Sequence, residues 1–228
     1  DHRYKCVIDS MANTLLELGV PFTIFVNGAS LEGKVFWRDK VRAIISHDLV
    51  AECEATLRRT RKIAGLSFYK YTKDPRNDSR VVHEEIDRFL EDRGICLQPE
   101  GHTMDAERYF LKHPLVTYGN HSHHHYVLSS MPPEAQREEV LRTQHLLDAV
   151  PGVHQSRVFS IPFGEPQDFN EVTLDVVREA GYHGAVLSRQ RFNRQWKSRR
   201  GVRLIERFMP EDAPIAGQFR QVRRLILG

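Results

Sequence analysis

The sequence predicts an α/β fold built on a parallel sheet. Short apolar runs alternate with longer stretches in which apolar residues recur at helical spacing. The chain has 228 residues, which is enough for one domain with a sizeable core, and no internal repeat divides it. Hydrophobic residues make up 40% and charged residues 28%, as in an ordinary globular protein. We therefore expect a single domain over residues 1–228.

The first part of the chain contains two predicted helices and a strand. Apolar residues at helical spacing precede Gly19, which is placed to end a helix, and they are Val7, Ile8, Met11, Leu15 and Leu18. Residues 22–26 form a continuous apolar run, which is typical of a strand buried on both faces. A second amphipathic helix has the apolar positions Trp37, Val41, Ile44 and Ile45.

The remaining elements continue this alternation. Residues 48–80 are polar and basic without a clear period, and the next helix carries Val82, Ile86, Phe89 and Leu90 before Gly94. We interpret residues 48–100 approximately as an insertion in the same domain. A helix capped by Ser130 runs to about Val150, and a helix capped by Asn170 follows. Strands are predicted at residues 157–161, 185–188 and 202–205.

The most informative stretch is a run of histidines after a short strand. Residues 115–118 are followed by Gly119-Asn120 and then by His121-Ser122-His123-His124-His125. Imidazole is the commonest metal-ligating side chain, and strand ends in α/β folds carry the chemistry. Two imidazoles four residues apart can converge on one cation if the backbone coils between them. A catalytic site needs a further protein ligand and an open position for water. The alternative interpretation is a solvated histidine cluster.

Several motifs resemble the polysaccharide deacetylases, the NodB-like carbohydrate esterases. The stretch from Gly119 to His125 is similar to their second motif, His-Ser/Thr-x-x-His. Residues 19–26 (GVPFTIFV), 159–164 (FSIPFG) and 177–182 (VREAGY) are similar to other family motifs in the expected order. Residues 36–40 (FWRDK) resemble an insertion of the exopolysaccharide-type members.

This resemblance implies an irregular (β/α) barrel with the insertion over its mouth and the site at the carboxyl ends of the strands. It implies metal-dependent hydrolysis of N-acetyl groups on an amino-sugar polysaccharide or glycan, with release of acetate. His121 and His125 would be metal ligands, and the Ser122 hydroxyl would hold the loop. The expected cofactor is one divalent metal ion, with zinc favoured.

The family's first motif supplies the catalytic base and the third metal ligand, and this chain starts inside it. Asp1 fits as the base, with His2 as a ligand in a three-histidine site that suits zinc. In the other register, Asp1 is itself the ligand. A barrel beginning here lacks the strand that should precede Asp1, so we expect about one more strand at the N-terminus of the complete protein.

Other positions depart from the family. Ser160 stands where the third motif often has arginine. Pro162 and Phe163 are placed to direct a backbone N–H at the substrate oxyanion, or else they form only a structural turn. No late Leu-x-x-His motif follows, so the general acid is unassigned. The alternative function is therefore a non-catalytic metal- or glycan-binding relative that has lost a working base and acid.

Charge and composition limit the kinds of molecule that the protein can bind. A net charge of +3 argues against a nucleic-acid binder, and no apolar run is long enough to span a bilayer. The expected partner is an acetylated glycan. The three cysteines are an odd, widely spaced set rather than a disulfide framework. The N-terminus carries no recognisable signal, which leaves cytoplasm and periplasm both open.

Overall fold

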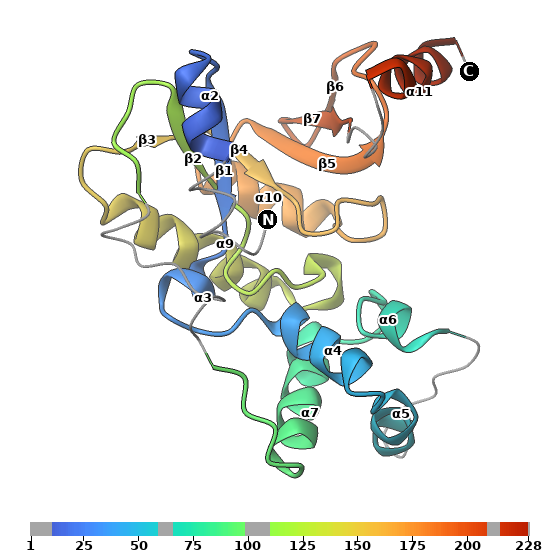
Figure 1. Ribbon diagram of the computed structural model, residues 1–228. Helices are drawn as coiled ribbons and strands as arrows, with labels where there is room; N and C mark the ends of the chain where they lie inside the picture. The colour runs from blue at the N-terminus through green and yellow to red at the C-terminus, as the bar shows by residue number, and fades with distance from the viewer. Residues whose placement is uncertain (1–10, 59–65, 99–109, 209–214, 228) are drawn as a thin grey trace.

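The strands of the protein form two sheets. The structure is a computed structural model that describes residues 11–58, 66–98, 110–208 and 215–227 (Figure 1). The first sheet is parallel with the order β1-β2-β3, and the second has the order β4-β5-β7-β6 with only β6 antiparallel. The strands are β1 (Phe22–Val26), β2 (Val116–Asn120), β3 (His154–Gln155), β4 (Val158–Ser160), β5 (Gly184–Gln190), β6 (Lys197–Arg199) and β7 (Val202–Arg207). The predicted α/β class with parallel pairing is confirmed.

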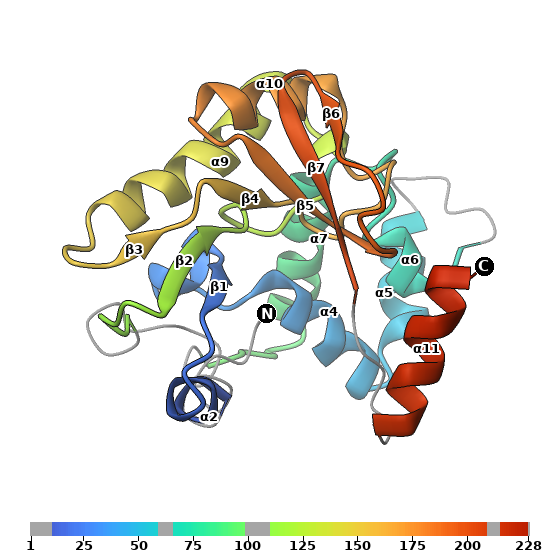
Figure 2. The same ribbon diagram turned by 90° about the horizontal axis from the view of Figure 1, so that it is seen from above.

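The structure confirms a mixed α/β arrangement but not the predicted barrel. The described strands pair within two separate sheets and do not close into one barrel. Helices α9 (Pro133–Asp148) and α10 (Glu171–Glu179) lie side by side along one side of the strands (Figure 2). Helix α11 (Ile215–Leu227) follows at the C-terminal end. The additional strand expected before Asp1 lies outside the described residues and stays a prediction.

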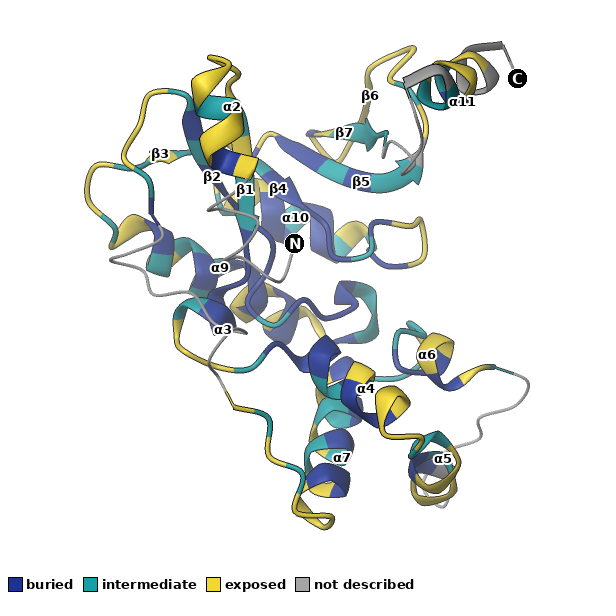
Figure 3. Ribbon diagram, viewed as in Figure 1, coloured by how far each residue is buried: buried dark blue, intermediate teal, exposed yellow. Residues whose placement is uncertain are grey.

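Four helices gather at one end of the molecule, below the strands in Figure 1. They are α4 (Trp37–Ser46), α5 (Val50–Arg58), α6 (Phe68–Tyr71) and α7 (Ser79–Glu91). The α7 prediction is confirmed, and Gly94 has the left-handed φ of +64° that favours glycine after a helix. Helix α4 carries both buried and exposed residues (Figure 3). Trp37, Val41 and Ile44 are buried as expected, but Ile45 is 44% exposed.

The N-terminal helix differs from its prediction. Helix α2 spans Asn13–Glu17, and Gly19 follows with a φ of +66°, so the helix ends where expected. Its apolar face does not pack as predicted, because Met11 and Leu18 are 57% and 70% exposed whereas Ala12 is buried. Val7 and Ile8 lie outside the described residues. Strand β1 is present, but Thr23 on it is exposed, so its two faces are not both buried.

The second half follows the predicted order with one change at a helix start. Asn170 caps α10 through a reciprocal pair of hydrogen bonds with Thr173. Helix α9 instead begins at Pro133 without a side-chain cap, since Ser130 belongs to a short 3₁₀ turn (Leu128–Ser130). The Ser130 hydroxyl donates to the Val127 carbonyl at 2.6 Å. No described helix is long and apolar enough to cross a membrane.

A short helix follows β1 and packs against the histidine loop, with no space left between them. Helix α3 spans Gly28–Leu31, and a Cβ added at Gly28 would lie 2.3 Å from His123 Nδ1 and 2.4 Å from Thr143 Oγ1. We therefore expect Gly28→Ala to destabilise the protein by about 1–3 kcal/mol through overpacking. Urea unfolding would measure this change. The double variant Gly28→Ala/Thr143→Ala should recover part of the loss, and an unchanged midpoint in Gly28→Ala would contradict the packing.

Candidate active site

A pocket opens at the carboxyl ends of four parallel strands. Its volume is about 450 Å³. His121 and His125 follow β2, Phe163 follows β4, Ser188 lies near the end of β5, and Arg207 ends β7. Helix α4 and the segment around α6 complete the walls with Phe36, Arg38, Arg42, Tyr69 and Lys73. The predicted location of the site at these strand ends is therefore supported by the pocket.

Hydrogen bonds hold the backbone that leaves β2. The His121 N–H donates to the Val26 carbonyl at 2.9 Å, which extends the pairing of β1 with β2. The Asn27 amide donates to the carbonyls of His121 at 2.6 Å and Ser122 at 3.2 Å. Asn120 Nδ2 donates to the Val140 carbonyl at 2.8 Å and so ties the end of β2 to α9. Strands β1 and β2 and helix α9 thus fix the position of the loop.

Ser122 then turns the chain so that two histidines face the same pocket. The Asn120 side-chain oxygen accepts from the Ser122 N–H at 2.9 Å, and the Ser122 hydroxyl oxygen accepts from the His125 N–H at 3.0 Å. Ser122 and His125 have φ values of 64° and 62°, a left-handed conformation that is costly for residues with a Cβ. The hydroxyl residue therefore holds the loop, as the motif implies.

The rings of His121 and His125 meet nearly at right angles. Their centroids are 4.6 Å apart and their planes form an angle of 88°. His121 Nδ1 lies 2.8 Å from the Ser160 carbonyl, which can only accept, so the proton is on Nδ1 and Nε2 keeps its lone pair. Burial lowers the pKa of His121 to about 4, so this imidazole is neutral at pH 7. Neutral, oriented imidazoles are what a metal ion requires.

The Pro162-Phe163 turn closes the pocket beside His125. Phe163 also has a left-handed φ, of 61°, and its ring lies 4.7 Å from that of His125 in an edge-on arrangement. The Gly164 N–H donates to the Pro162 carbonyl at 2.7 Å, which makes a tight turn. Ser160, at the position where the resemblance leads one to expect arginine, contributes its backbone carbonyl to His121.

The two intervening histidines of the run point elsewhere. The backbone N–H of His124 donates to Glu139 Oε2 at 2.8 Å, and its ring Nδ1 lies 2.6 Å from Glu139 Oε1. His123 is 1% exposed, and its Nε2 lies 3.6 Å from Glu32. His124 thus fastens the loop to α9, and His123 is buried near the end of α3; neither side chain lines the pocket of His121 and His125.

One family comparison covers the histidine motif. Residues 102–185 match the family described as polysaccharide deacetylase, a span that contains β2, the histidine loop, the Pro162-Phe163 turn and α10. This stretch of the chain is similar to the polysaccharide deacetylase family. Among solved structures, the chain is similar to a Streptococcus pyogenes deacetylase, PplD, in complex with acetate, at 15% identity and a TM-score of 0.40. That similarity covers 60% of this chain and 54% of the other, and no curated protein matches the chain.

The family's remaining metal ligand and base cannot be placed. Asp1 and His2, the residues predicted for these roles, lie outside the described residues, so both registers stay predictions. Within the described ranges, no group of three or more histidine, cysteine, aspartate or glutamate side chains is arranged to hold a metal ion. The ligand roles of His121 and His125, like that of the third ligand, stay predictions.

Asp168 is a pocket residue that the sequence analysis missed. It lines the same cavity and is only 4% exposed. Burial raises the pKa of its carboxyl group to about 6, although Oδ2 accepts from the Glu165 N–H at 2.8 Å. A carboxyl group with a raised pKa in a cleft is a candidate for proton transfer. Its place, four residues after Gly164 on the same loop, was the available signal.

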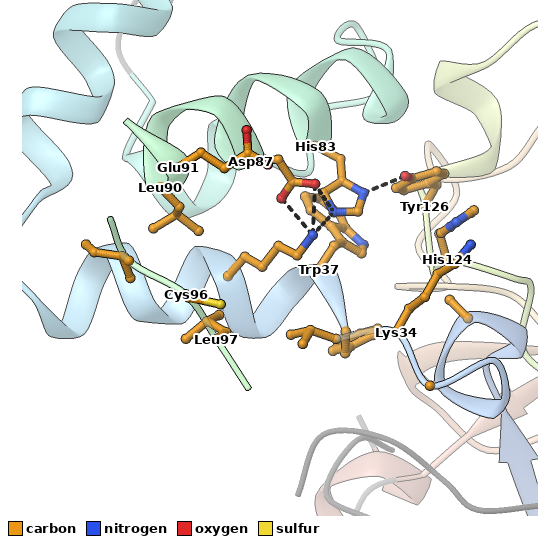
Figure 4. A pocket seen from close by; sticks show the side chains of 16 residues that line it. Lys34, Trp37, His83, Asp87, Leu90, Glu91, Cys96, Leu97, His124 and Tyr126 are labelled. Atoms are coloured by element: carbon orange, nitrogen blue, oxygen red, sulfur yellow. Dashed lines mark hydrogen bonds and ion pairs between the residues drawn. The ribbon is translucent and has the colours of Figure 1, made fainter. Parts of the chain in front are cut away.

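A second pocket, of about 520 Å³, shares the lining residue Phe36 with the first and also contains Trp37 (Figure 4). His83 Nε2 lies 2.9 Å from Lys40 Nζ, which only donates, so His83 is neutral and its Nδ1 donates to the Tyr126 hydroxyl at 2.6 Å. Lys40 also pairs with Asp87 at 2.6 Å. The charges in this cluster are paired with one another, and His83 packs α7 against His124 of the histidine loop.

The state of His83 gives a prediction about acid stability. Burial, together with the smaller effects of the neighbouring Lys40 and His124, lowers the pKa of His83 to about 3. The unfolded chain takes up the proton near pH 6.5 and the folded chain does not, so stability falls as the pH drops below about 6.5. For this group alone, the loss between pH 7.5 and pH 5 is about 2 kcal/mol.

Urea unfolding at the two pH values would measure the loss. His83→Gln removes the titrating group and should show a smaller decrease than the wild type. His145→Gln, at an exposed position on α9, should retain the full decrease. Equal decreases in wild type and His83→Gln would contradict the assignment.

Proposed function

We propose that this protein hydrolyses N-acetyl groups on an amino-sugar polysaccharide or glycan with the help of one divalent metal ion, most suitably zinc. The observation that carries the proposal is the perpendicular pair of buried imidazoles, His121 and His125, at the carboxyl ends of parallel strands. The match of residues 102–185 to the polysaccharide deacetylase family supports deacetylation as the general reaction. The metal and the glycan are our proposals.

The chain's own residues prepare the site for amide hydrolysis. His121 and His125 would hold the ion together with His2 or Asp1. When bound, such an ion lowers the pKa of a water molecule and polarises the amide carbonyl. The Ser160 carbonyl orients His121, and the Ser122 hydroxyl orients the backbone of His125. The Pro162-Phe163 turn is placed to direct a backbone N–H at the developing oxyanion.

Asp168 is the residue that we assign to proton transfer. Amide hydrolysis requires a proton on the leaving nitrogen, and the pKa of Asp168, raised to about 6 by burial, leaves part of it protonated near neutral pH. The loop that carries Asp168 also carries the turn beside His125, so its carboxyl group opens into the same pocket. This assignment fills the role that the absent Leu-x-x-His motif leaves vacant.

The metal assignment predicts that histidine variants lose zinc. His121→Ala and His125→Ala should each lower zinc content well below one ion per chain, because each removes a ligand. The rate of acetate release from a chitooligosaccharide should fall about a thousandfold or more, since several kcal/mol of transition-state stabilisation are lost. Elemental analysis and an acetate assay would measure both. His145→Ala, exposed on α9, is the matched control and should change neither.

Three outcomes separate the two candidate functions. Acetate release that a chelator abolishes and zinc restores would support the enzyme. Release that persists in a chelator and in His121→Ala would rule out this mechanism. Zinc binding without release from any acetylated glycan would favour the non-catalytic binding relative.

The role of Asp168 predicts a change in the pH profile. A proton donor with a pKa of about 6 loses its active form tenfold per pH unit above that value, so wild-type kcat should decline above pH 6. Asp168→Asn can still accept from the Glu165 N–H, and it should lower kcat by about 10²- to 10⁴-fold and remove this decline. Steady-state kinetics between pH 5 and pH 8 would show it, with Glu165→Gln as the control that keeps the decline. A decline that survives in Asp168→Asn would assign the proton to another group.

A further inference from the structure

The pocket with the two imidazoles is also lined by four cationic side chains, Arg38, Arg42, Lys73 and Arg207. Arg42 pairs with Asp39 at 2.5 Å. The other three have no carboxylate within ion-pair distance among the residues that the structure describes, although Glu165 and Asp168 line the same cavity. Lys40 in the second pocket provides a contrast, because it is paired with Asp87. The cations beside the histidines thus lack the partner that the neighbouring pocket provides.

Arg38 lies in the floor of the pocket and is only 3% exposed. Its Nη1 donates to Thr72 Oγ1 at 2.8 Å. Its Nη2 makes no hydrogen bond of acceptable geometry within the described ranges, although Tyr69 lies close. The guanidinium carbon is 4.6 Å from the ring centroid of Trp37, 4.7 Å from that of Tyr69 and 5.6 Å from that of Phe163.

Burial lowers the pKa of Arg38 to about 10, so it stays charged at neutral pH. Arginine is almost never fully buried unless it is paired, because taking its charge out of water is costly. The aromatic rings offset part of this cost and hold the guanidinium in place. They do not neutralise its charge, so the floor of the pocket carries a fixed positive potential.

Arg207 and Lys73 bring two more cations to the walls. Arg207 Nη2 donates to Ser188 Oγ at 2.7 Å, while its Nε has no partner among the described residues. Its charge contributes to lowering the pKa of His121, after the larger effect of burial, so it acts on the imidazole pair. Lys73 Nζ lies 5.0 Å from the ring centroid of Tyr69 and 5.7 Å from that of Phe163, the same two rings that Arg38 contacts.

We propose that this pocket selects a glycan that carries an anionic group, a carboxylate or a phosphate, close to the acetamido group. The inference rests on the proposed function, since it names the substrate class of the same site. Lys73 and Arg207 would bind the anion directly, and Arg38 would supply charge from beneath the rings of Tyr69 and Phe163. A neutral glycan would leave these cations with only Glu165 and Asp168 in the same cavity, neither of them within ion-pair distance, in a pocket partly removed from water.

Equilibrium binding measured by NMR titration would test the proposal without relying on turnover. The probes are N-acetylglucosamine, N-acetylmuramic acid and N-acetylglucosamine 6-phosphate, which offer no anion, a carboxylate and a phosphate. We expect at least one anionic sugar to bind about tenfold or more tightly than the neutral one, and the preference to shrink at high salt. The stronger of the two anionic probes identifies the source of the charge. Equal affinities for all three sugars would overturn the proposal.

Variants at the cations sharpen the test. Lys73→Gln should weaken binding of the preferred anionic sugar about tenfold and leave N-acetylglucosamine unchanged, because one charge-assisted contact is lost. Arg207→Gln should act in the same direction. Lys70→Gln is the matched control, with the same charge change at an exposed position on α6 outside the pocket. An anion preference that survives in both Lys73→Gln and Arg207→Gln would overturn the assignment.

The outcomes also separate this inference from the proposed function. Preferential binding of an anionic sugar without acetate release from any glycan would uphold the pocket and refute the hydrolysis. Acetate release from neutral chitooligosaccharides together with equal affinities for the three sugars would uphold the hydrolysis and refute the anion preference.

Discussion

The site depends on hydrogen bonds that hold residues 121–125 in a backbone conformation they would not adopt alone. Left-handed φ values at Ser122 and His125 cost about 1–3 kcal/mol each. Asn27 and Asn120 offset this cost, because each of these fully buried amides bonds to the loop from a neighbouring element or turn. A buried partner left unsatisfied costs about 1–3 kcal/mol, so the loop cannot relax without loss on β1 or α9. The position of the two imidazoles is therefore fixed by hydrogen bonds to the elements around the loop.

Removal of water from the site then sets its protonation states. Burial lowers the pKa of His121 and raises the pKa of Asp168, because it disfavours the charged form of both groups. The histidine keeps the lone pair that a metal ion needs, and the aspartate keeps part of its proton near neutral pH. One physical effect thus prepares a ligand and a proton donor in the same pocket. Burial also disfavours protonation of His121 in the folded protein, so the free energy of unfolding decreases at acid pH.

Local patterns in the sequence predicted those features that local interactions determine. The capping of α10 by Asn170, the helix before Gly94, and strands β1 and β2 follow from residues close together in the chain. The histidine spacing pointed to the pocket for the same reason, since a single turn at Ser122 brings the two rings together. The exposed face of α2 could not be foreseen, because helical spacing of apolar residues does not reveal which face has a partner.

Features set by tertiary contacts escaped the sequence analysis. Ser130 has the chemistry of a helix cap, but Val127 and Ser79 compete for its hydroxyl group, and α9 starts later. Arg38 on α4 and Arg207 on β7 are far apart in the chain, and the tertiary fold brings both of them to the lining of one pocket. An arginine in an amphipathic helix normally faces water, so the hydrophobic pattern of the sequence does not reveal that Arg38 is buried among aromatic rings.

The charges in the pocket link its two proposed ligands. Arg207 acts on His121 and would also repel a divalent cation held by that imidazole. An anion placed between the cationic walls and the metal site reduces this repulsion, so the two ligands should each increase the affinity of the other, and by the same factor. An anionic glycan would then strengthen the metal site that acts on it, whereas a neutral glycan would leave the repulsion in place. If both proposals hold, the same cations would couple binding of the substrate to binding of the metal ion.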